Sequence, residues 1–364
     1  MSTAIRKHSQ VSLKQAVDFC LAMEGEVTPH LVGQKGIGKT SAIEKAVPDK
    51  YTCAFFDCTS LTLEDIGIMD LNREEKFAEY LFNKHWGFHL DKPLFIVLDE
   101  FTKAPKNLQA MLHGLLTKPR RIGSIKIHPD SIVVSTGNLK AEGVGDRMLG
   151  HTSNRFVNIY VRNSKSEEWI AWGIPAGIHP TVLAWAKRKP ELFQSFVDDP
   201  EGTNEYISNP KRGDVKCVTG RSLEFASKII WKFFDGKFGE DTLRSALEGT
   251  IGGRGATDLL LFIKMVEKLP SPEEIIADPD TAKIPEDGGA VSITVSSALS
   301  WVDDAVKLGK WFTYMKRLPA EAQAYFILLG RTQEEGLGKI MMRHKAFQDW
   351  AIENEHMWNN GERL

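Results

Sequence analysis

One eight-residue segment constrains this chain more than any other. Residues 33–40 read Gly-Gln-Lys-Gly-Ile-Gly-Lys-Thr and fit the pattern G-x-x-x-x-G-K-[ST] of a phosphate-binding loop. An apolar run, His30-Leu31-Val32, precedes the segment, and residues 41–46 read as a helix. A loop between a strand and a helix directs backbone N–H groups at an anion, and the helix dipole favours the negative charge. We therefore expect an α/β unit that binds a nucleotide.

The residue types in this loop have separate tasks. Gly36 and Gly38 can adopt positive φ without a Cβ clash, so the backbone amides can close around a phosphate. Lys39 is expected to reach the β- and γ-phosphates, and the Thr40 hydroxyl to ligate Mg²⁺. The predicted cofactors are thus ATP and Mg²⁺. The predicted nucleotide-binding residues are Gly33, Gln34, Lys35, Gly36, Ile37, Gly38, Lys39, Thr40 and Ser41.

Two acids follow an unbroken apolar run. Residues 94–98 are long and apolar enough for a strand that is buried on both faces, and Asp99 and Glu100 come directly after it. In an open α/β sheet, ligands collect at the carboxyl ends of the strands. We predict that Asp99 holds Mg²⁺ through water, and that Glu100 orients and deprotonates the attacking water.

The chain divides by its pattern of elements. Strand-like runs alternate with helical segments up to about residue 165, which is typical of a parallel sheet with crossover helices. Residues 76–82 look helical and could be an insertion. Beyond residue 165 we expect helices and few strands, with residues 270–290 as an extended, proline-rich linker. The predicted strands are residues 30–32, 52–56, 94–98, 132–135 and 156–161.

Composition excludes several classes of protein. Among the 364 residues, 46 Lys and Arg nearly balance 48 Asp and Glu, whereas a nucleic-acid coat carries a strong basic excess. Four cysteines are too few and too scattered for a disulfide scaffold. No window approaches the ~18 apolar residues of a membrane span, and the first residues are polar, unlike a signal peptide. We expect a soluble, cytoplasmic protein that makes no use of a membrane.

Together these motifs resemble the AAA+ ATPases, and within them the MoxR-like branch, especially that of tailed bacteriophages and prophages. Residues 59–67 resemble the branch's t-x-x-D-l-x-G segment, and residues 99–105 its D-E-x-x-x-A-P run. Residues 135–138, Ser-Thr-Gly-Asn, resemble its A-T-x-N. The resemblance covers residues 12–230 and extends more weakly to the end of the chain.

The resemblance implies a fold and its division into domains. The fold class is an α/β P-loop NTPase (AAA+) core with a parallel five-stranded sheet, followed by a helical lid and a C-terminal helical extension. The corresponding domains are residues 1–208 for nucleotide binding, residues 209–270 for the lid, and residues 271–364 for a linker and the extension.

The resemblance also assigns the remaining catalytic residues. Asn138 stands at the sensor 1 position, where a side-chain amide hydrogen-bonds the attacking water or the γ-phosphate. Arg155 matches the arginine finger that enters the neighbouring subunit's site. Arg147 is a nearby competitor, but Arg155 directly abuts a strand, as the pattern requires. Arg221 resembles the sensor 2 residue at the head of a lid helix.

A finger supplied by a neighbour implies a closed ring, and the resemblance implies a homo-hexamer. The implied activity is ATP hydrolysis coupled to chaperone-like remodelling of a partner protein, which in this branch has a von Willebrand factor A-type domain.

An alternative is a DNA-directed AAA+ motor or loader in phage replication. The near-neutral charge argues against it, so nucleic acid is not indicated. A small-molecule P-loop kinase is a second alternative, but a kinase needs no arginine from a neighbouring subunit. A ring with a vestigial ATPase and a structural role is a third, and the complete catalytic set argues against it.

Weaker features leave alternatives open. The basic stretch of residues 118–121, with Lys126 and His128, reads either as a pore-facing hairpin that touches an acidic partner or nucleic acid, or as a solvated rim. Phe77 and residues 80–82 could belong to a pore element or a partner-binding element within an insertion. His85 and His89 read as loop residues rather than metal ligands. The C-terminal aromatic residues read as core rather than as a binding platform; they are Trp301, Trp311, Phe312, Tyr325 and Phe326.

Overall fold

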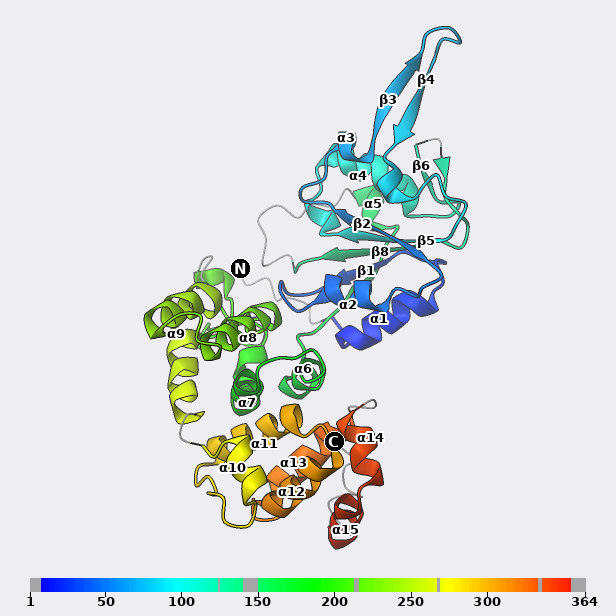
Figure 1. Cartoon of the computed structure of the whole chain (residues 1–364). Coiled ribbons are helices and arrows are strands. Elements are labelled where there is room, and N and C mark those ends of the chain that lie inside the picture. Colours follow the sequence, from blue (N-terminus) through cyan, green and yellow to red (C-terminus); the bar gives the residue numbers. More distant parts are fainter. Residues whose placement is uncertain are drawn as a thin grey trace. The chain divides into compact units, whose positions relative to one another are not determined.

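The computed structural model divides the chain into two compact units, Met1–Ser164 and Lys165–Leu364 (Figure 1). It describes residues 8–123, 125–139, 150–212, 216–266, 269–332 and 336–354. The domain boundaries proposed after residues 208 and 270 both lie within the second unit. That finer division of the helical region stays a prediction.

A five-stranded sheet organises the first unit. Its order is β2-β5-β8-β1-β9, and all neighbouring strands are parallel. The predicted strands are all confirmed, with small shifts at their ends. Strand β8 lies between β5, which ends in the acids, and β1, which leads into the glycine-rich loop. The strands are β1 (Pro29–Val32), β2 (Thr52–Asp57), β5 (Leu94–Asp99), β8 (Ile132–Gly137) and β9 (Val157–Tyr160).

Helices cover both faces of this sheet (Figure 1). Phe95 and Val97 of β5 pack in one cluster with α1 (Leu13–Ala22) and α2 (Lys39–Ala46). The alternate residues of β5 pack in a second cluster with α4 (Lys106–Leu112). Because both faces are covered, β5 and β8 are almost continuously apolar, as central parallel strands usually are.

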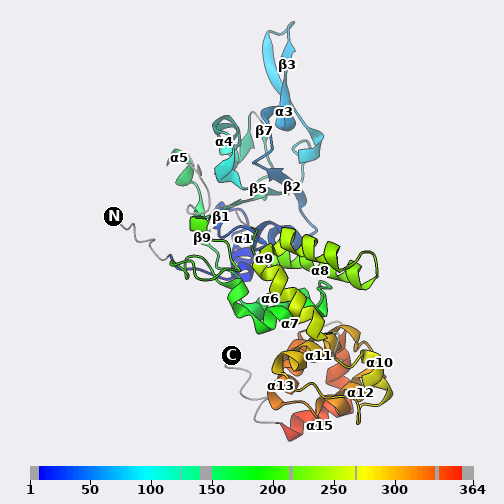
Figure 2. The same ribbon diagram turned by 90° about the vertical axis from the view of Figure 1, so that its left-hand side faces the viewer.

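One predicted element is wrong. The segment expected to be helical at residues 76–82 forms strand β4 (Phe77–Phe82), which pairs antiparallel with β3 (Gly67–Asn72). The Asn72 carboxamide accepts the N–H groups of Glu74 and Glu75 and so shapes the turn between the strands. Short apolar segments fit either state locally, and here pairing with β3 decides the outcome. The hairpin β3–β4 projects from its unit after the short helix α3 (Leu63–Ile66) (Figures 1 and 2).

The second unit is helical, and none of its described residues lies in a strand, as expected. One continuous hydrophobic cluster runs from Trp169 to Trp350. The long helix α9 kinks at Gly252, which has φ +78°. The helices are α6 (Ser166–Gly173), α7 (Pro180–Arg188), α8 (Gly220–Phe234), α9 (Glu240–Val266), α10 (Pro272–Ala277), α11 (Gly288–Trp301), α12 (Ala305–Met315), α13 (Ala320–Arg331), α14 (Leu337–Arg343) and α15 (Lys345–Glu353).

The segment expected to be an extended linker is more structured than predicted. Residues 272–277 form α10, which begins with a capping box at Ser271. Arg317 donates to the carbonyls of Pro279 and Ala282, so the rest of the segment is tied to the end of α12. The proline and acidic residues that suggested a linker instead form the first turn of α10.

The C-terminal aromatic residues pack mainly inside the second unit. Trp311, Phe312 and Phe326 are all at most 1% exposed, which confirms that they are core. Within the described ranges, no helix is long and apolar enough to cross a membrane. The fold class is confirmed as a five-stranded parallel α/β core followed by a helical region.

Candidate functional site

The glycine-rich loop connects β1 to α2, as the sequence predicts. Gly36 and Gly38 have φ of +76° and +91°, so both occupy the left-handed region that favours glycine. At Gly33 a Cβ atom would lie 2.8 Å from Ile37 Cδ1 and 2.9 Å from the Val161 carbonyl oxygen. The loop therefore needs glycine at these positions for its backbone path. With this loop at the end of β1, the first unit has the fold of a P-loop NTPase core.

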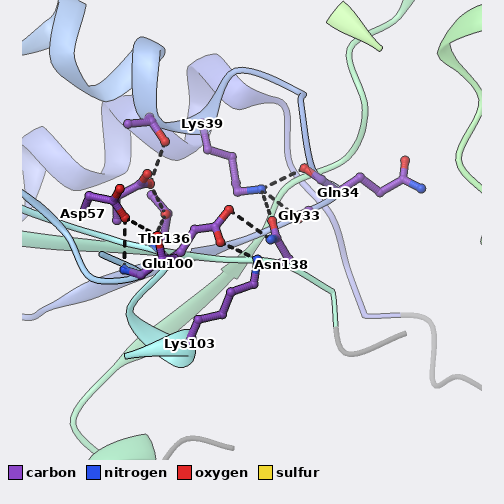
Figure 3. A network of polar contacts seen from close by, with 11 residues as sticks. Gly33, Gln34, Lys39, Asp57, Glu100, Lys103, Thr136 and Asn138 are labelled. Atoms are coloured by element: carbon purple, nitrogen blue, oxygen red, sulfur yellow. Dashed lines mark hydrogen bonds and ion pairs between the residues drawn. The ribbon is translucent and has the colours of Figure 1, made fainter. Parts of the chain in front are cut away.

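The Lys39 side chain is folded under the loop. Its Nζ donates to the carbonyls of Gly33 and Gln34, each at 2.8 Å, and to Asn138 Oδ1 at 3.2 Å (Figure 3). Lys39 is the first residue of α2 and is buried. Its positive charge lies between the loop and the end of β8, on the side where a loop-bound phosphate needs a counter-charge.

Asp99 accepts hydrogen bonds from two hydroxyl groups. Thr40 Oγ1 donates to Asp99 Oδ1 at 2.6 Å, and Thr136 Oγ1 donates to the same oxygen at 2.5 Å. A carboxylate beside a hydroxyl is an all-oxygen donor set, which suits Mg²⁺. The residues predicted to hold Mg²⁺, Thr40 and Asp99, thus lie together and fit the ion.

Glu100 begins a sharp turn of the chain. Its φ of +49° and ψ of +38° are left-handed, which is uncommon for a residue other than glycine. Its N–H donates to Thr136 Oγ1 at 3.0 Å. Its carboxylate accepts from Asn138 Nδ2 at 3.3 Å and pairs with the Lys103 ammonium (Figure 3). The structure therefore brings Glu100 and Asn138 together with Lys39.

The predicted arginines lie elsewhere. Arg155 donates to Thr117 Oγ1 at 2.6 Å and stands just before β9. The first residue of β9, Val157, pairs with Pro29, the first residue of β1, whereas the loop leaves the last residue of β1. Arg155 thus lies at the amino-terminal end of the parallel strands, whereas its own loop lies at their carboxyl-terminal end.

Arg221 is exposed at the second position of α8, in the other unit. The competing residue Arg147 lies outside the described residues.

The basic stretch is not a continuous charged surface. Arg120 is 4% exposed and donates to the carbonyls of Leu115, Gly25 and Val27. Burial lowers its pKa to about 10, so it stays charged at neutral pH. Lys118 pairs with Glu26 at 2.7 Å. Arg120 therefore ties loops together, and the partner-binding interpretation does not apply to it.

Sequence reasoning missed Thr136, Lys103 and His30. Thr136 and Lys103 lie within the motifs quoted for Asn138 and Glu100, but nothing in those motifs states their contacts. His30 is buried on β1, with Nδ1 3.0 Å from Ser135 Oγ. Burial, aided by the nearby Lys39 charge, lowers the pKa of His30 to about 4, so the ring is neutral. No group of three or more His, Cys, Asp or Glu side chains among the described residues is arranged to hold a metal ion.

No protein-family model and no curated protein matches this chain. Among solved structures, NtrX from Brucella abortus in complex with ADP is 14% identical with a TM-score of 0.38, covering 91% of this chain and 70% of that one. The Saccharomyces cerevisiae Hsp104–casein complex is 13% identical with a TM-score of 0.38, covering 63% and 46%. These TM-scores are too low to establish a shared fold. The P-loop NTPase fold of the first unit is therefore assigned from its strand order and the geometry of its glycine-rich loop.

Proposed function

We propose that this chain is an AAA+ ATPase that binds ATP with Mg²⁺ and hydrolyses the bond between the β- and γ-phosphates, releasing ADP and inorganic phosphate. One observation carries the proposal. Lys39 and Thr40 of α2, the two acids at the end of β5 and Asn138 after β8 form one network of hydrogen bonds, connected through Thr136. Figure 3 shows the part of it around Lys39, Glu100, Thr136 and Asn138. Three separate sequence segments supply these groups, and phosphoryl transfer needs them at one place.

Each side chain in the network has a proposed task. The loop, residues 33–41, binds the phosphates, and Lys39 transfers its hydrogen bonds from the loop carbonyls to phosphate oxygens. Glu100 accepts a proton from the attacking water, while the Asn138 amide orients that water. Thr40 and Asp99 would hold Mg²⁺, which neutralises charge that develops on the phosphates.

We propose that Arg155 acts on the nucleotide of a neighbouring subunit. It lies at the level of the first residue of β1, and the four residues of that strand rise about 3.3 Å each before the loop begins. Arg155 is therefore poorly placed for its own loop. This supports a ring, proposed as a MoxR-like homo-hexamer that remodels a partner protein, with a von Willebrand factor A-type domain as the partner class. Arg221 is proposed as the sensor 2 residue.

The test measures Mg-ATP hydrolysis per subunit over a wide range of protein concentration. We expect specific activity to rise steeply with concentration and Arg155→Ala to lower it by ~10³-fold or more. Arg121→Ala is the control, since Arg121 is an exposed arginine of the same unit. A flat rate that survives Arg155→Ala would exclude the assigned finger and direct attention to Arg147. Strong stimulation by DNA would favour a DNA-directed motor instead.

Mixing two inactive variants separates a neighbour's finger from one acting within its own subunit. Glu100→Gln lacks the base but keeps Arg155, and Arg155→Ala has the opposite defect. If the finger enters the next subunit, mixed rings contain some sites with both groups, and activity returns. If both groups act within one subunit, no mixture recovers activity.

A further inference from the structure

The Thr136 hydroxyl links the two acids of the site. Its oxygen accepts the Glu100 N–H at 3.0 Å and its proton goes to Asp99 Oδ1 at 2.5 Å. The directions are fixed by chemistry, because an amide N–H can only donate and an ionised carboxylate can only accept. Thr136 is 1% exposed, so water does not compete for these bonds.

The bond to Glu100 supports an unusual backbone conformation. Glu100 leaves β5 in the left-handed region and enters the short 3₁₀ turn η2 (Phe101–Lys103), where the Lys103 N–H donates to the Glu100 carbonyl. A left-handed residue other than glycine persists only when its surroundings hold it. The Glu100 N–H is held by β8, the strand next to β5, through Thr136. The Thr136 hydroxyl thus helps to hold the backbone of Glu100, from which the side chain of the proposed base extends.

The bond to Asp99 fixes the other acid. Thr40 and Thr136 approach the same carboxylate oxygen from two different elements, α2 and β8. Among the described residues, neither hydroxyl nor any other group forms a hydrogen bond with Oδ2. The carboxylate is therefore oriented through Oδ1, and Oδ2 remains available for metal-bound water.

We propose that Thr136 is a positioning residue for hydrolysis, and that its one hydroxyl sets both the metal-binding carboxylate and the backbone of the general base. This inference depends on the proposed ATPase function. It predicts that removal of the hydroxyl changes the chemical step and Mg²⁺ dependence, while the glycine-rich loop still binds nucleotide.

The experiment compares Thr136→Val with Thr136→Ser. Valine keeps the shape and loses the hydroxyl, whereas serine keeps the hydroxyl. We expect Thr136→Val to lower kcat by about 100-fold, the effect of a ~1 Å misplacement of a reacting group, with little change in KM for ATP. It should also raise the Mg²⁺ concentration needed for half-maximal ATP binding, while Mg²⁺-free ADP binding stays unchanged. Thr136→Ser should recover most of the rate.

Ser135→Ala is the matched control, because Ser135 is the preceding residue of β8, is equally buried and bonds His30 rather than the acids. Its kcat should stay close to that of the wild type. A crystal structure of Thr136→Val gives a readout independent of activity: Glu100 φ should leave the left-handed region.

Three results would overturn the inference. The first is a wild-type kcat and Mg²⁺ dependence in Thr136→Val. The second is a lower melting temperature in Thr136→Val with unchanged kinetics, which indicates a purely structural role. If Thr136→Val does not fold, Thr136→Cys replaces it, because a thiol fills the site but forms only weak hydrogen bonds. A wild-type rate of hydrolysis in Thr136→Cys is the third result. An absence of hydrolysis by the wild type would instead refute the ATPase proposal itself.

Discussion

Single residues of the site are connected in a chain of hydrogen bonds. The Asn138 carboxamide lies between two opposite charges, because its oxygen accepts from Lys39 and its nitrogen donates to Glu100. Sequence motifs identified these residues because each motif is short and local. They did not identify the contacts of Thr136, since those depend on the register in which Leu98 of β5 pairs with Ser135 of β8. Register is a property of the folded sheet, and neither strand encodes it alone.

Replacement of Asn138 tests this connection. We expect Asn138→Ala to lower kcat by about 100-fold, because it removes the group proposed to orient the attacking water, while nucleotide affinity changes little. Steady-state kinetics and ADP titration measure the two effects. Asn107→Ala is a suitable control, as Asn107 is exposed in α4 and its carboxamide oxygen accepts the Leu108 N–H. A large loss of ADP affinity with normal kcat would contradict the role.

At the scale of elements, burial determined which elements were predictable. The central strands are apolar on both faces, so their sequences identify them directly. The hairpin β3–β4 has no such signal, because both of its faces meet solvent. Five of its apolar side chains are 43–59% exposed: Ile68, Met69, Leu71, Phe77 and Leu81. A local sequence pattern equally cannot predict long-range hydrogen bonds from side chains to backbone carbonyls, such as those of Arg317.

The kink in α9 gives a prediction at this scale. A Cβ atom on Gly252 would lie 2.3 Å from the Lys216 carbonyl oxygen, at φ +78°. Gly252→Ala should therefore lower the free energy of unfolding by about 1–3 kcal/mol. Its neighbour Gly253 faces open space within the helix, so Gly253→Ala should stabilise the protein by up to about 1 kcal/mol. Denaturant unfolding compares the two, and equal effects would refute the steric explanation.

Among the described residues, the first unit contains the buried His30 and the second unit the buried His179, and both have a lowered pKa. Burial lowers the pKa of both His30 and His179 to about 4. His179 caps α7, because its Nδ1 accepts the Thr181 N–H at 3.1 Å. Neither ring can take up a proton at mildly acidic pH without losing its buried environment. We therefore expect that a buried neutral histidine makes the stability of each unit sensitive to acid.

The stability of the protein should fall on mild acidification. Above pH ~6.5 both histidines are neutral in the folded and unfolded states and contribute nothing to the pH dependence. Between pH ~6.5 and ~4 only the unfolded chain binds the protons, so each histidine lowers the free energy of unfolding by up to ~1.4 kcal/mol per pH unit. Urea unfolding at a series of pH values measures this slope.

His179→Asn provides the control for that slope. Asparagine is a good helix cap and does not titrate, so the variant should keep α7 and lose the part of the pH dependence that His179 contributes. A wild-type slope in this variant would exclude His179 as a source.

The base of the hairpin has a consequence for how the molecule can vary. The Asn83 N–H donates to the Ile66 carbonyl at 2.9 Å, and Gly67 pairs with Phe82, so the chain enters and leaves the hairpin at adjacent points. We therefore expect that residues 68–81 can be shortened, exchanged or labelled without moving β2 or β5. We expect that mutation can redesign this protrusion as an independent module, while the residues proposed to bind the nucleotide stay unchanged.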